Sequence, residues 1–364
     1  MYGCLARARS YNRARLATGA SSSADRSVGA NLRARSILEH MATRAPDPNP
    51  RPLHDPSQTL RIRALHDSPS VSVYDVCCRP RDFQRGAEEW SLSHQIVFPR
   101  RGVFERETRG RKLLADSNQV LFFNRGESYR VAHPGGCGDE CTVWVFDDAL
   151  SREAIAEWDP AWAESSSQLF RFPQVASDAR VFWRQDWLRR AAAPGAPRLA
   201  VEEAAVQLLR SLLESSYRQR AGSLRPPGRS NARSATSRLH AEQVERTSLL
   251  LATRFAEDLS LDAIARAVHC SPFHLARLFR AQCGLSIHQY RHRLRLREAL
   301  RRLSEGEANL SALALELGFS SHSHLSDAFR QAFGLSPAQS RAAATARGQR
   351  EMSKILEVPA LVHP

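Results

Sequence analysis

The strongest constraint in this sequence is an internal repeat in its last third. When residues 274–291 are aligned with the residues fifty positions later, nine of eighteen positions are identical. The identical positions are His274-Leu275 with His324-Leu325, Phe279-Arg280 with Phe329-Arg330, Gly284-Leu285-Ser286 with Gly334-Leu335-Ser336, Gln289 with Gln339, and Arg291 with Arg341. A repeat at a fixed spacing means that one structural unit is used twice. We therefore expect the last third to fold as two similar units.

The first unit has the pattern of a helix-turn-helix. Ser260 stands in the N-cap position of a short helix expected over residues 261–268. Ser271 and Pro272 provide a second N-cap and first helical residue, and Gly284 ends the second helix. The buried face of this second helix is expected to hold Leu275, Leu278 and Phe279, and its open face to hold Phe273, His274, Ala276, Arg277 and Arg280.

The second unit repeats the pattern. Asn309 or Ser311 is expected to cap its first helix, and Gly318 supplies the tight turn. A second helix is expected over residues 321–333, with Gly334 at its end. Its buried face is expected to hold Leu325, Ala328 and Phe329, and its open face to hold His322, Ser323, Ser326, Asp327 and Arg330.

A helix rich in arginine is expected to join the two units over residues 286–304. At 1.5 Å per residue this helix spans roughly 28 Å, which approaches one turn of B-DNA, about 34 Å. The second helix of each unit would then enter one of two successive major grooves on one DNA face. Arg277 carries the guanidinium fork that pairs with guanine, whereas Arg295 and Arg297 on the joining helix are expected to contact phosphate.

Two stretches carry a family resemblance: SLDAIARAVHCSPFHLARLFRAQCGLSIHQYRHRLRLREALRRL, and then ALALELGFSSHSHLSDAFRQAFGLSPAQSR. Together they resemble the AraC/XylS family of transcription regulators over roughly residues 242–342. The resemblance implies a seven-helix DNA-binding domain, often fused to a cupin-like domain for effector binding and dimerisation. It also implies promoter DNA, a small-molecule effector and RNA polymerase as partners. The DNA-facing residues that it implies are Phe273, Ala276 and Arg277, then His322, Ser323, Ser326 and Asp327.

Four positions depart from the family pattern. His269 stands where the first turn usually has Gly, Ile287 replaces a usual Pro, and Ser340 replaces a usual aromatic residue. Asp327 occupies a position that is often Arg. A carboxylate near phosphate weakens binding, although it can accept a hydrogen bond from the cytosine amino group. The base preference of the second unit is therefore open.

The preceding residues indicate an α+β multidomain protein. Four runs of strand-like residues begin near Val71, Ser91, Gln119 and Cys141, with turn residues between them. They resemble, more weakly, the cupin-like sensor of the same regulators, without its metal-binding His pairs. The expected segments are a disordered extension (1–58), a β-rich sensor domain (59–147), a helical region (148–220), a flexible linker (221–238), an AraC-type DNA-binding domain (239–343) and a C-terminal tail (344–364).

The helical region contains an apolar stripe within residues 198–220. Its members are Val201, Ala205, Leu208, Leu209, Leu212 and Leu213. Such a stripe pairs two copies of the chain in a homodimer, or packs the helix on its own β domain. The sequence favours neither alternative.

The Arg- and Ser-rich start of the sequence superficially resembles a transit peptide. The simpler interpretation is that Met41 is the true initiator.

Several residues of the sensor domain could bind a metal or an effector. The metal candidates are His94, His133, Cys137 and Cys141, with Cys77 and Cys78 nearby in sequence. Thiolates and imidazoles suit a tetrahedral metal, but the spacing is loose, so buried cysteines and a turn histidine are favoured over a metal site or a redox-sensing thiol. No effector site is assigned. Arg100 and Arg101 could bind an anionic effector, but the favoured interpretation is that they lie at a solvated strand end.

Composition narrows the function classes. Lys and Arg outnumber Asp and Glu by 52 to 38, a formal net charge of +14, which favours a polyanionic partner. Seven cysteines, an odd number without a secretory segment, favour a reduced cytoplasm. No apolar run is long enough for a membrane span.

Two classes of enzyme would need a recognisable pattern of residues. An oxygenase needs a His/carboxylate triad, and repair of alkylated DNA needs closely paired cysteines; neither pattern is visible in the sequence. We expect no enzyme and no cofactor, and a structured N-terminal half disfavours a purely architectural DNA binder.

Overall fold

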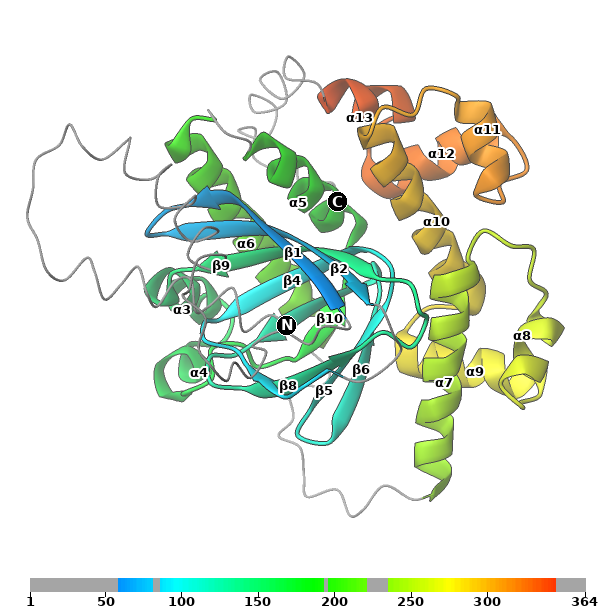
Figure 1. The fold of residues 1–364 in the computed structure, drawn as a ribbon, viewed down its shortest axis with the longest axis horizontal. Helices are drawn as coiled ribbons and strands as arrows, with labels where there is room; N and C mark the ends of the chain where they lie inside the picture. The colour runs from blue at the N-terminus through cyan, green and yellow to red at the C-terminus, as the bar shows by residue number, and fades with distance from the viewer. Residues whose placement is uncertain (1–57, 81–85, 193–195, 221–234, 345–364) are drawn as a thin grey trace, which may run out of the picture.

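Figure 1 shows the computed structural model of the chain, which describes residues 58–80, 86–192, 196–220 and 235–344. Residues 58–220 form a β-rich domain with helices, and residues 235–343 form an all-helical domain, so both parts of the expected fold class are present. The expected extension and tail lie outside the described residues, apart from Gln58 and Ala344. No helix in the described segments has the length and apolar character needed to cross a membrane.

The strands of the first domain form two antiparallel sheets. The order of the larger sheet is β1-β2-β9-β4-β7-β10. Its strands are β1 (Gln58–Asp67), β2 (Val71–Pro80), β9 (Asp139–Phe146), β4 (Gln95–Arg101), β7 (Gln119–Phe123) and β10 (Gln174–Ala176). The order of the smaller sheet is β3-β8-β5-β6. Its strands are β3 (Glu89–Trp90), β8 (Ser128–Ala132), β5 (Phe104–Thr108) and β6 (Arg111–Ala115).

Alternation along the central strands divides the core of this domain into two layers. Successive side chains of a strand point to opposite faces. In β4, Val97 packs in a cluster with side chains of the smaller sheet, whereas Ile96 and Phe98 pack on the opposite face, against helices. In β9, Val143 and Trp144 divide in the same way. The larger sheet is therefore buried on both faces.

Four helices cover the outer face of the larger sheet (Figure 1). They are α3 (Asp148–Ala156), α4 (Pro160–Ser165), α5 (Ala179–Ala191) and α6 (Arg198–Arg220). The stripe expected within residues 198–220 is buried in the core that α6 shares with the sheet. Of the two alternatives, the structure supports packing on the own β domain, since these side chains are not free to pair with a second copy.

The boundary expected between residues 147 and 148 does not separate two units. β10, with Val175 buried at its centre, pairs with β7 inside the region that we expected to be helical. A three-residue strand with one apolar side chain gives too little periodicity to be detected in sequence. The β sheets and helices α3–α6 form one domain.

Seven helices form the second domain. They are α7 (Ala235–Arg254), α8 (Leu261–Ala267), α9 (Pro272–Cys283), α10 (Ile287–Ser304), α11 (Leu310–Glu316), α12 (His322–Phe333) and α13 (Pro337–Ala343). The expected linker is shorter than we inferred at its C-terminal end. Residues 235–238 begin α7, because this stretch has no Gly or Pro to prevent helix formation, and residues 221–234 lie outside the described part.

The two domains contact each other through several pairs of elements. α10 contacts β4, α12 contacts α5, and α7 contacts β6. Apolar side chains of α10 and α12, among them Leu300 and Phe329, belong to the same buried cluster as Trp183 of α5. The helical domain is thus packed against the β domain in this conformation (Figure 1).

Candidate nucleic-acid interface

Helix α9 presents the first candidate reading face. Ser271 caps the helix by accepting a hydrogen bond from the His274 amide, and Gly284 ends it in the left-handed conformation (φ 70°). Leu275 and Phe279 are buried. On the other side Arg277, Arg280 and Phe273 are exposed, and Phe273 is 79% exposed, whereas His274 and Ala276 are half-buried. A large exposed aromatic side chain beside two arginines suits contact with base edges.

The turn before α9 differs from the turn of the second unit in its residue type. His269 has φ 53°, and the corresponding turn residue of the second unit, Gly318, has φ 77°. Both positions therefore need the left-handed region, where a Cβ atom costs roughly 1–2 kcal/mol. The histidine that replaces the usual glycine is held there at an energetic cost.

Helix α12 presents the second candidate reading face. Ser321 caps it, Gly334 ends it (φ 78°), and Leu325 and Phe329 are buried. His322, Ser323, Asp327 and Arg330 are exposed, and Ser326 is half-buried. Asp327 lies 3.3 Å from Arg330 in an ion pair along the helix. The carboxylate that departs from the family pattern is thus partly compensated on the same face.

Helix α10 separates the two reading helices, and its N-terminus is closed by a capping box of Ser286 and Gln289. Arg295 does not stand free for a phosphate. It donates to the carbonyl oxygens of Phe255 (2.8 Å) and Gly318 (2.6 Å), and burial lowers its pKa to about 10. With Arg291, it lines a hollow of about 360 Å³ between the two units. In place of the expected phosphate, Arg295 contacts Phe255, which follows α7, and Gly318 in the turn of the second helix-turn-helix unit.

Arg297 is also placed differently from our expectation. Its side chain is 2% exposed and faces the β domain. It donates to the side-chain oxygen of Asn118 and to the Ser177 carbonyl (2.7 Å), and its guanidinium lies 4.8 Å from the centre of the Phe182 ring. Burial, followed by the charge of Arg293, lowers the pKa of Arg297 to about 9. In this conformation it joins the domains, and its buried guanidinium is not accessible to DNA.

A second set of hydrogen bonds reinforces this contact. The Tyr290 hydroxyl donates to the Asp116 carboxylate (2.5 Å) and accepts from the Gln119 amide (3.0 Å). Asn118 donates to the Tyr290 carbonyl (3.2 Å). Burial raises the pKa of Asp116 to about 6. The loop between β6 and β7 therefore hydrogen-bonds to Tyr290 and Arg297 of α10, and the polar groups of both partners are buried.

A carboxyl pair lies at another part of the domain contact. Glu245 of α7 shares a hydrogen bond with Glu105 of β5, and Lys112 lies 2.9 Å from Glu105. Burial, followed by the Glu105 carboxyl, raises the pKa of Glu245 to about 7. The pair therefore holds a proton near neutral pH.

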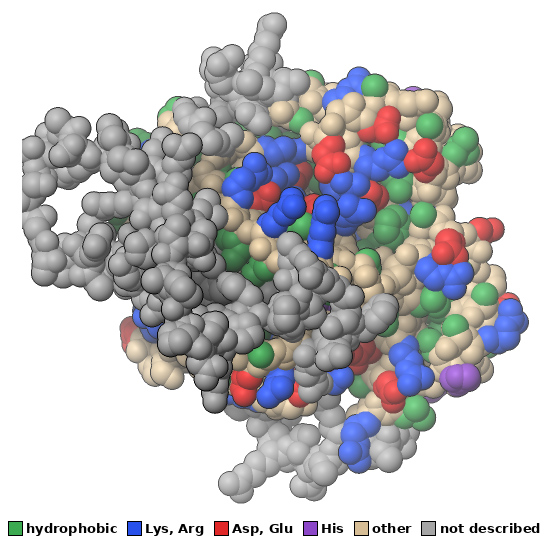
Figure 2. Space-filling model, in the orientation of Figure 1, with side chains coloured by type: hydrophobic (Ala, Val, Ile, Leu, Met, Phe, Trp, Pro, Cys, Tyr) green, Lys and Arg blue, Asp and Glu red, His purple; other side chains and the backbone are tan. Residues whose placement is uncertain are grey.

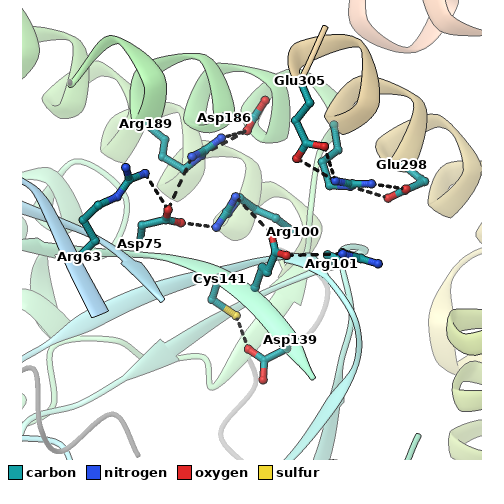
Figure 3. Close-up of polar contacts among 12 residues, drawn as sticks. Arg63, Asp75, Arg100, Arg101, Asp139, Cys141, Asp186, Arg189, Glu298 and Glu305 are labelled. Carbon is teal, nitrogen blue, oxygen red and sulfur yellow. Dashed lines mark hydrogen bonds and ion pairs between the residues drawn. The ribbon is translucent and has the colours of Figure 1, made fainter. Parts of the chain in front are cut away.

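Charged side chains gather on the face over α5 and α10. Figure 2 shows arginines interleaved with carboxylates there, not a patch of one sign. Asp75 binds Arg100, Arg63 (3.0 Å) and Arg189 (4.0 Å) (Figure 3). Arg100 is only 9% exposed, so it is neither a solvated strand end nor an open anion site. Arg101, 59% exposed, lies 3.6 Å from Glu140.

The structure brings together only some of the candidate metal ligands. His133 lies beside Cys78 and Asp139, and Cys141 donates a hydrogen bond to Asp139; all four are buried. Cys137 is exposed, and Cys77 is half-buried. His94 lies elsewhere, where it accepts from the Arg125 amide and contacts Phe170 edge-on. Burial raises the pKa of the Cys78 thiol to about 12, so this thiol stays protonated unless a cation binds beside it.

Sequence reasoning missed Asp139 as a member of this cluster and missed Asp116, Asn118 and Tyr290 as interdomain residues. Asp139 and Cys141 are two positions apart in a strand-like run, which places them on one face. That alternation was the available signal. For the interdomain residues there was none, because Asn118 and Tyr290 are 172 positions apart in the chain.

Comparison with known proteins gives matches in the helical domain. The family described as "Helix-turn-helix domain" matches residues 264–343. The HTH-type transcriptional activator RhaS of Escherichia coli (strain SE11) is 38% identical over 95 residues, which cover 25% of this chain and 34% of that protein. The chain thus matches about a third of the length of this curated relative.

Two solved structures are also similar. A transcriptional regulator from Chromobacterium violaceum, one of the AraC-type DNA-binding domain-containing proteins, is 30% identical, with coverage of 29% of this chain and 95% of that chain, at a TM-score of 0.28. ToxT from Vibrio cholerae is 10% identical, with coverage of 74% and 97%, at a TM-score of 0.30.

Proposed function

We propose that this chain is a transcription regulator of the AraC/XylS family, to which its C-terminal domain is similar, and that it reads promoter DNA with two helices of one chain. In this proposal α9 and α12 enter successive major grooves, and α10 sets the distance between them. Arg277 reads a base through its guanidinium fork. His322, Ser323 and the Asp327–Arg330 pair read the second groove, and His274, Ala276, Ser326 and Arg280 complete the two faces.

The observation that carries the proposal is the pair of exposed faces at opposite ends of α10 (Figure 1). Each recognition helix buries apolar residues on one face, among them Leu275 and Phe279 in α9 and Leu325 and Phe329 in α12, and has charged side chains exposed on the other. The 18 residues of α10 span about 27 Å at 1.5 Å per residue. This length is close enough to the pitch of B-DNA for both helices to contact one face of an unbent or slightly bent duplex.

The β domain has a regulatory role in the proposal. It holds Tyr290 and Arg297 of α10, and α10 in turn positions both reading helices. A small-molecule effector that changes the β domain would therefore change the spacing or freedom of the reading helices. The effector's identity stays open. Such a regulator acts in the bacterial cytoplasm, on DNA and with RNA polymerase, and it performs binding and not catalysis.

Dimerisation is not needed for two-groove contact, because one chain carries both reading helices. A homodimer remains part of the proposal only as a source of added affinity. Since the stripe of α6 is buried within its own domain, a dimer would have to use another surface.

Genomic binding-site selection with the full chain tests the proposal. We expect two blocks of preferred bases whose centres are about 10 base pairs apart, one helical turn. Arg277→Ala should relax one block, and the double change His322→Ala with Ser323→Ala should relax the other. Arg218→Ala, which removes an exposed charge from the β domain, serves as the matched control. Enrichment of a single block, or none, would contradict two-helix reading.

A further inference from the structure

A cluster of potential metal ligands lies at one end of the larger sheet of the β domain. Cys78 of β2 is directly opposite Asp139 of β9 in the strand register, and Cys141 follows two positions later on the same face. His133 comes immediately after β8. Ligand atoms of Cys78, His133 and Asp139 all lie within 4.8 Å of one another. The fold thus gathers three potential ligands from three segments, and Cys141 lies beside Asp139.

Asp139 is the centre of this cluster. Its Oδ1 lies 2.6 Å from Nε2 of His133, and its Oδ2 accepts a hydrogen bond from Sγ of Cys141 at 3.0 Å (Figure 3 shows the Cys141 contact). The four side chains are almost completely removed from solvent, with exposures of 2% for Cys78, 1% for His133, 3% for Asp139 and 0% for Cys141. A buried carboxylate is costly without compensation, and here His133 and Cys141 provide it.

One polar atom of the cluster has no partner. Nδ1 of His133 is buried and makes no hydrogen bond within the part of the chain that the structure describes. Buried imidazole nitrogens ordinarily find a hydrogen-bond partner. Its other ring nitrogen, Nε2, faces the Asp139 carboxylate and is the nitrogen available to the cluster.

The loop from β8 to β9 closes over the cluster. A Cβ atom on Gly138 would lie 1.9 Å from the Cys78 carbonyl oxygen, so the loop backbone is pressed directly on β2. A Cβ atom on Gly135 would lie 2.9 Å from Cγ2 of Thr253 on α7. The cluster therefore lies beneath a tight glycine loop, at the edge of the domain contact.

We propose that Cys78, His133 and Asp139 bind a divalent transition-metal ion, with Zn²⁺ as the best-suited ion, and that the Cys141 thiol, which donates to Asp139 in this structure, turns to the ion as the fourth ligand. Two thiolates, one imidazole and one carboxylate are all donors that zinc accepts, and four protein ligands are typical of a closed structural site. On binding, both thiols lose their protons to solvent and the His133–Asp139 hydrogen bond opens. The proposal does not depend on DNA binding, so it can fail while the proposed function stands.

Direct titration of the full-length protein with Co²⁺ tests this site. Protein freed of metal by a chelator is titrated with Co²⁺ alone, and the visible and near-ultraviolet spectra are recorded. We expect one equivalent per chain, with the ligand-field bands of tetrahedral cobalt and thiolate-to-cobalt charge transfer, both abolished by one equivalent of Zn²⁺. If folded wild-type protein gives no such spectrum with Co²⁺ and retains no Zn²⁺ in elemental analysis, the proposal is wrong.

Variants locate the ion. Asp139→Asn and Cys141→Ser keep side-chain size and should weaken Co²⁺ binding more than about 100-fold, since even groups that only orient ligands contribute 10–100-fold. Cys77→Ser and Cys137→Ser are the matched controls, because Cys77 is on the other face of β2 and Cys137 is exposed in the loop. Both controls should bind as wild type does. Equal loss in the controls, or unchanged binding in a Cys78→Ser, Cys141→Ser double variant, would overturn the assignment. Circular dichroism of each variant identifies any that fails to fold.

Discussion

At the scale of single residues, Arg277 offers the clearest test of DNA reading. Its side chain is exposed, on the opposite side of α9 from the buried Leu275 and Phe279. Arg277→Ala should therefore leave folding intact. We expect it to cost about 1–3 kcal/mol of binding to the selected site and to relax preference at one base position. Electrophoretic shift titrations on selected and scrambled DNA measure both effects. Equal loss on the two DNAs would make Arg277 a phosphate contact.

His269 gives a prediction about stability. Its φ of 53° carries the strain of a Cβ in the left-handed region, which glycine avoids, although glycine loses more entropy on folding. We expect His269→Gly to stabilise the helical domain by about 0.5–1 kcal/mol, measured by urea unfolding. The opposite change, Gly318→Ala, should destabilise it, because the new Cβ would lie 2.8 Å from the Ala256 carbonyl oxygen. No gain from His269→Gly would mean that the strain at His269 does not exceed the entropic cost of glycine.

At the scale of elements, the contact of α7 with β5 should depend on pH. The pKa of Glu245 is raised from its ordinary 4.5 to about 7, so packing favours the protonated form. The stabilisation from this group is then complete below about pH 4.5 and is lost as the pH rises through about 7. At higher pH, Glu245 and Glu105 repel each other, with Lys112 nearby as partial compensation.

Hydrogen exchange of α7 and β5, corrected for the intrinsic pH dependence, measures this effect. We expect protection to fall between pH 6 and pH 8 in the wild type. Glu245→Gln keeps the hydrogen-bonding capacity and removes the charge. In this variant the protection of α7 and β5 from exchange should therefore change little over the same pH range. Glu153→Gln, which removes an exposed carboxylate of α3, is the control, because Glu153 does not act on Glu245. A decrease in Glu245→Gln as large as in the wild type would assign the effect to another group.

At the scale of the whole molecule, Arg297 decides how firmly the domains are joined. Hydrogen bonds of a buried charged group are worth about 1.5–3 kcal/mol each, and Arg297 makes them to Asn118 and Ser177. We expect Arg297→Met to release α10 from the β domain and to increase the radius of gyration in small-angle scattering. Arg293→Met, on the half-exposed side of the same helix, should leave the scattering unchanged.

Release of the domains should also alter DNA binding if the β domain restrains the reading helices. We expect the affinity of Arg297→Met for the selected site to rise, in a titration at fixed salt. An expanded chain with reduced affinity would show that the domain contact supports reading. Unchanged scattering would show that the hydrophobic contacts of α10 and α12 hold the domains without Arg297.

Much of the helical domain could be predicted because its signals are local. Ser260, Ser271, Asn309 and the C-terminal glycine Gly284 lie within a few residues of the helix ends that they set, and all act as expected. The alternation of β4 and β9 is likewise a local pattern. A short strand such as β10 has too few residues to produce one, so its pairing with β7 came only from the fold.

The sequence by itself determined the two helix-turn-helix units and the faces of α9 and α12, since caps, glycines and helical periodicity act over a few residues. Only the tertiary structure decided what the remaining arginines and cysteines do. Arg297 looks like any exposed arginine of a basic helix, yet its partner Asn118 is 179 positions away. Cys78 and Asp139 meet through strand pairing across 61 positions. Contacts between distant segments leave no periodic trace in a sequence, because what fixes them is the packing of whole elements.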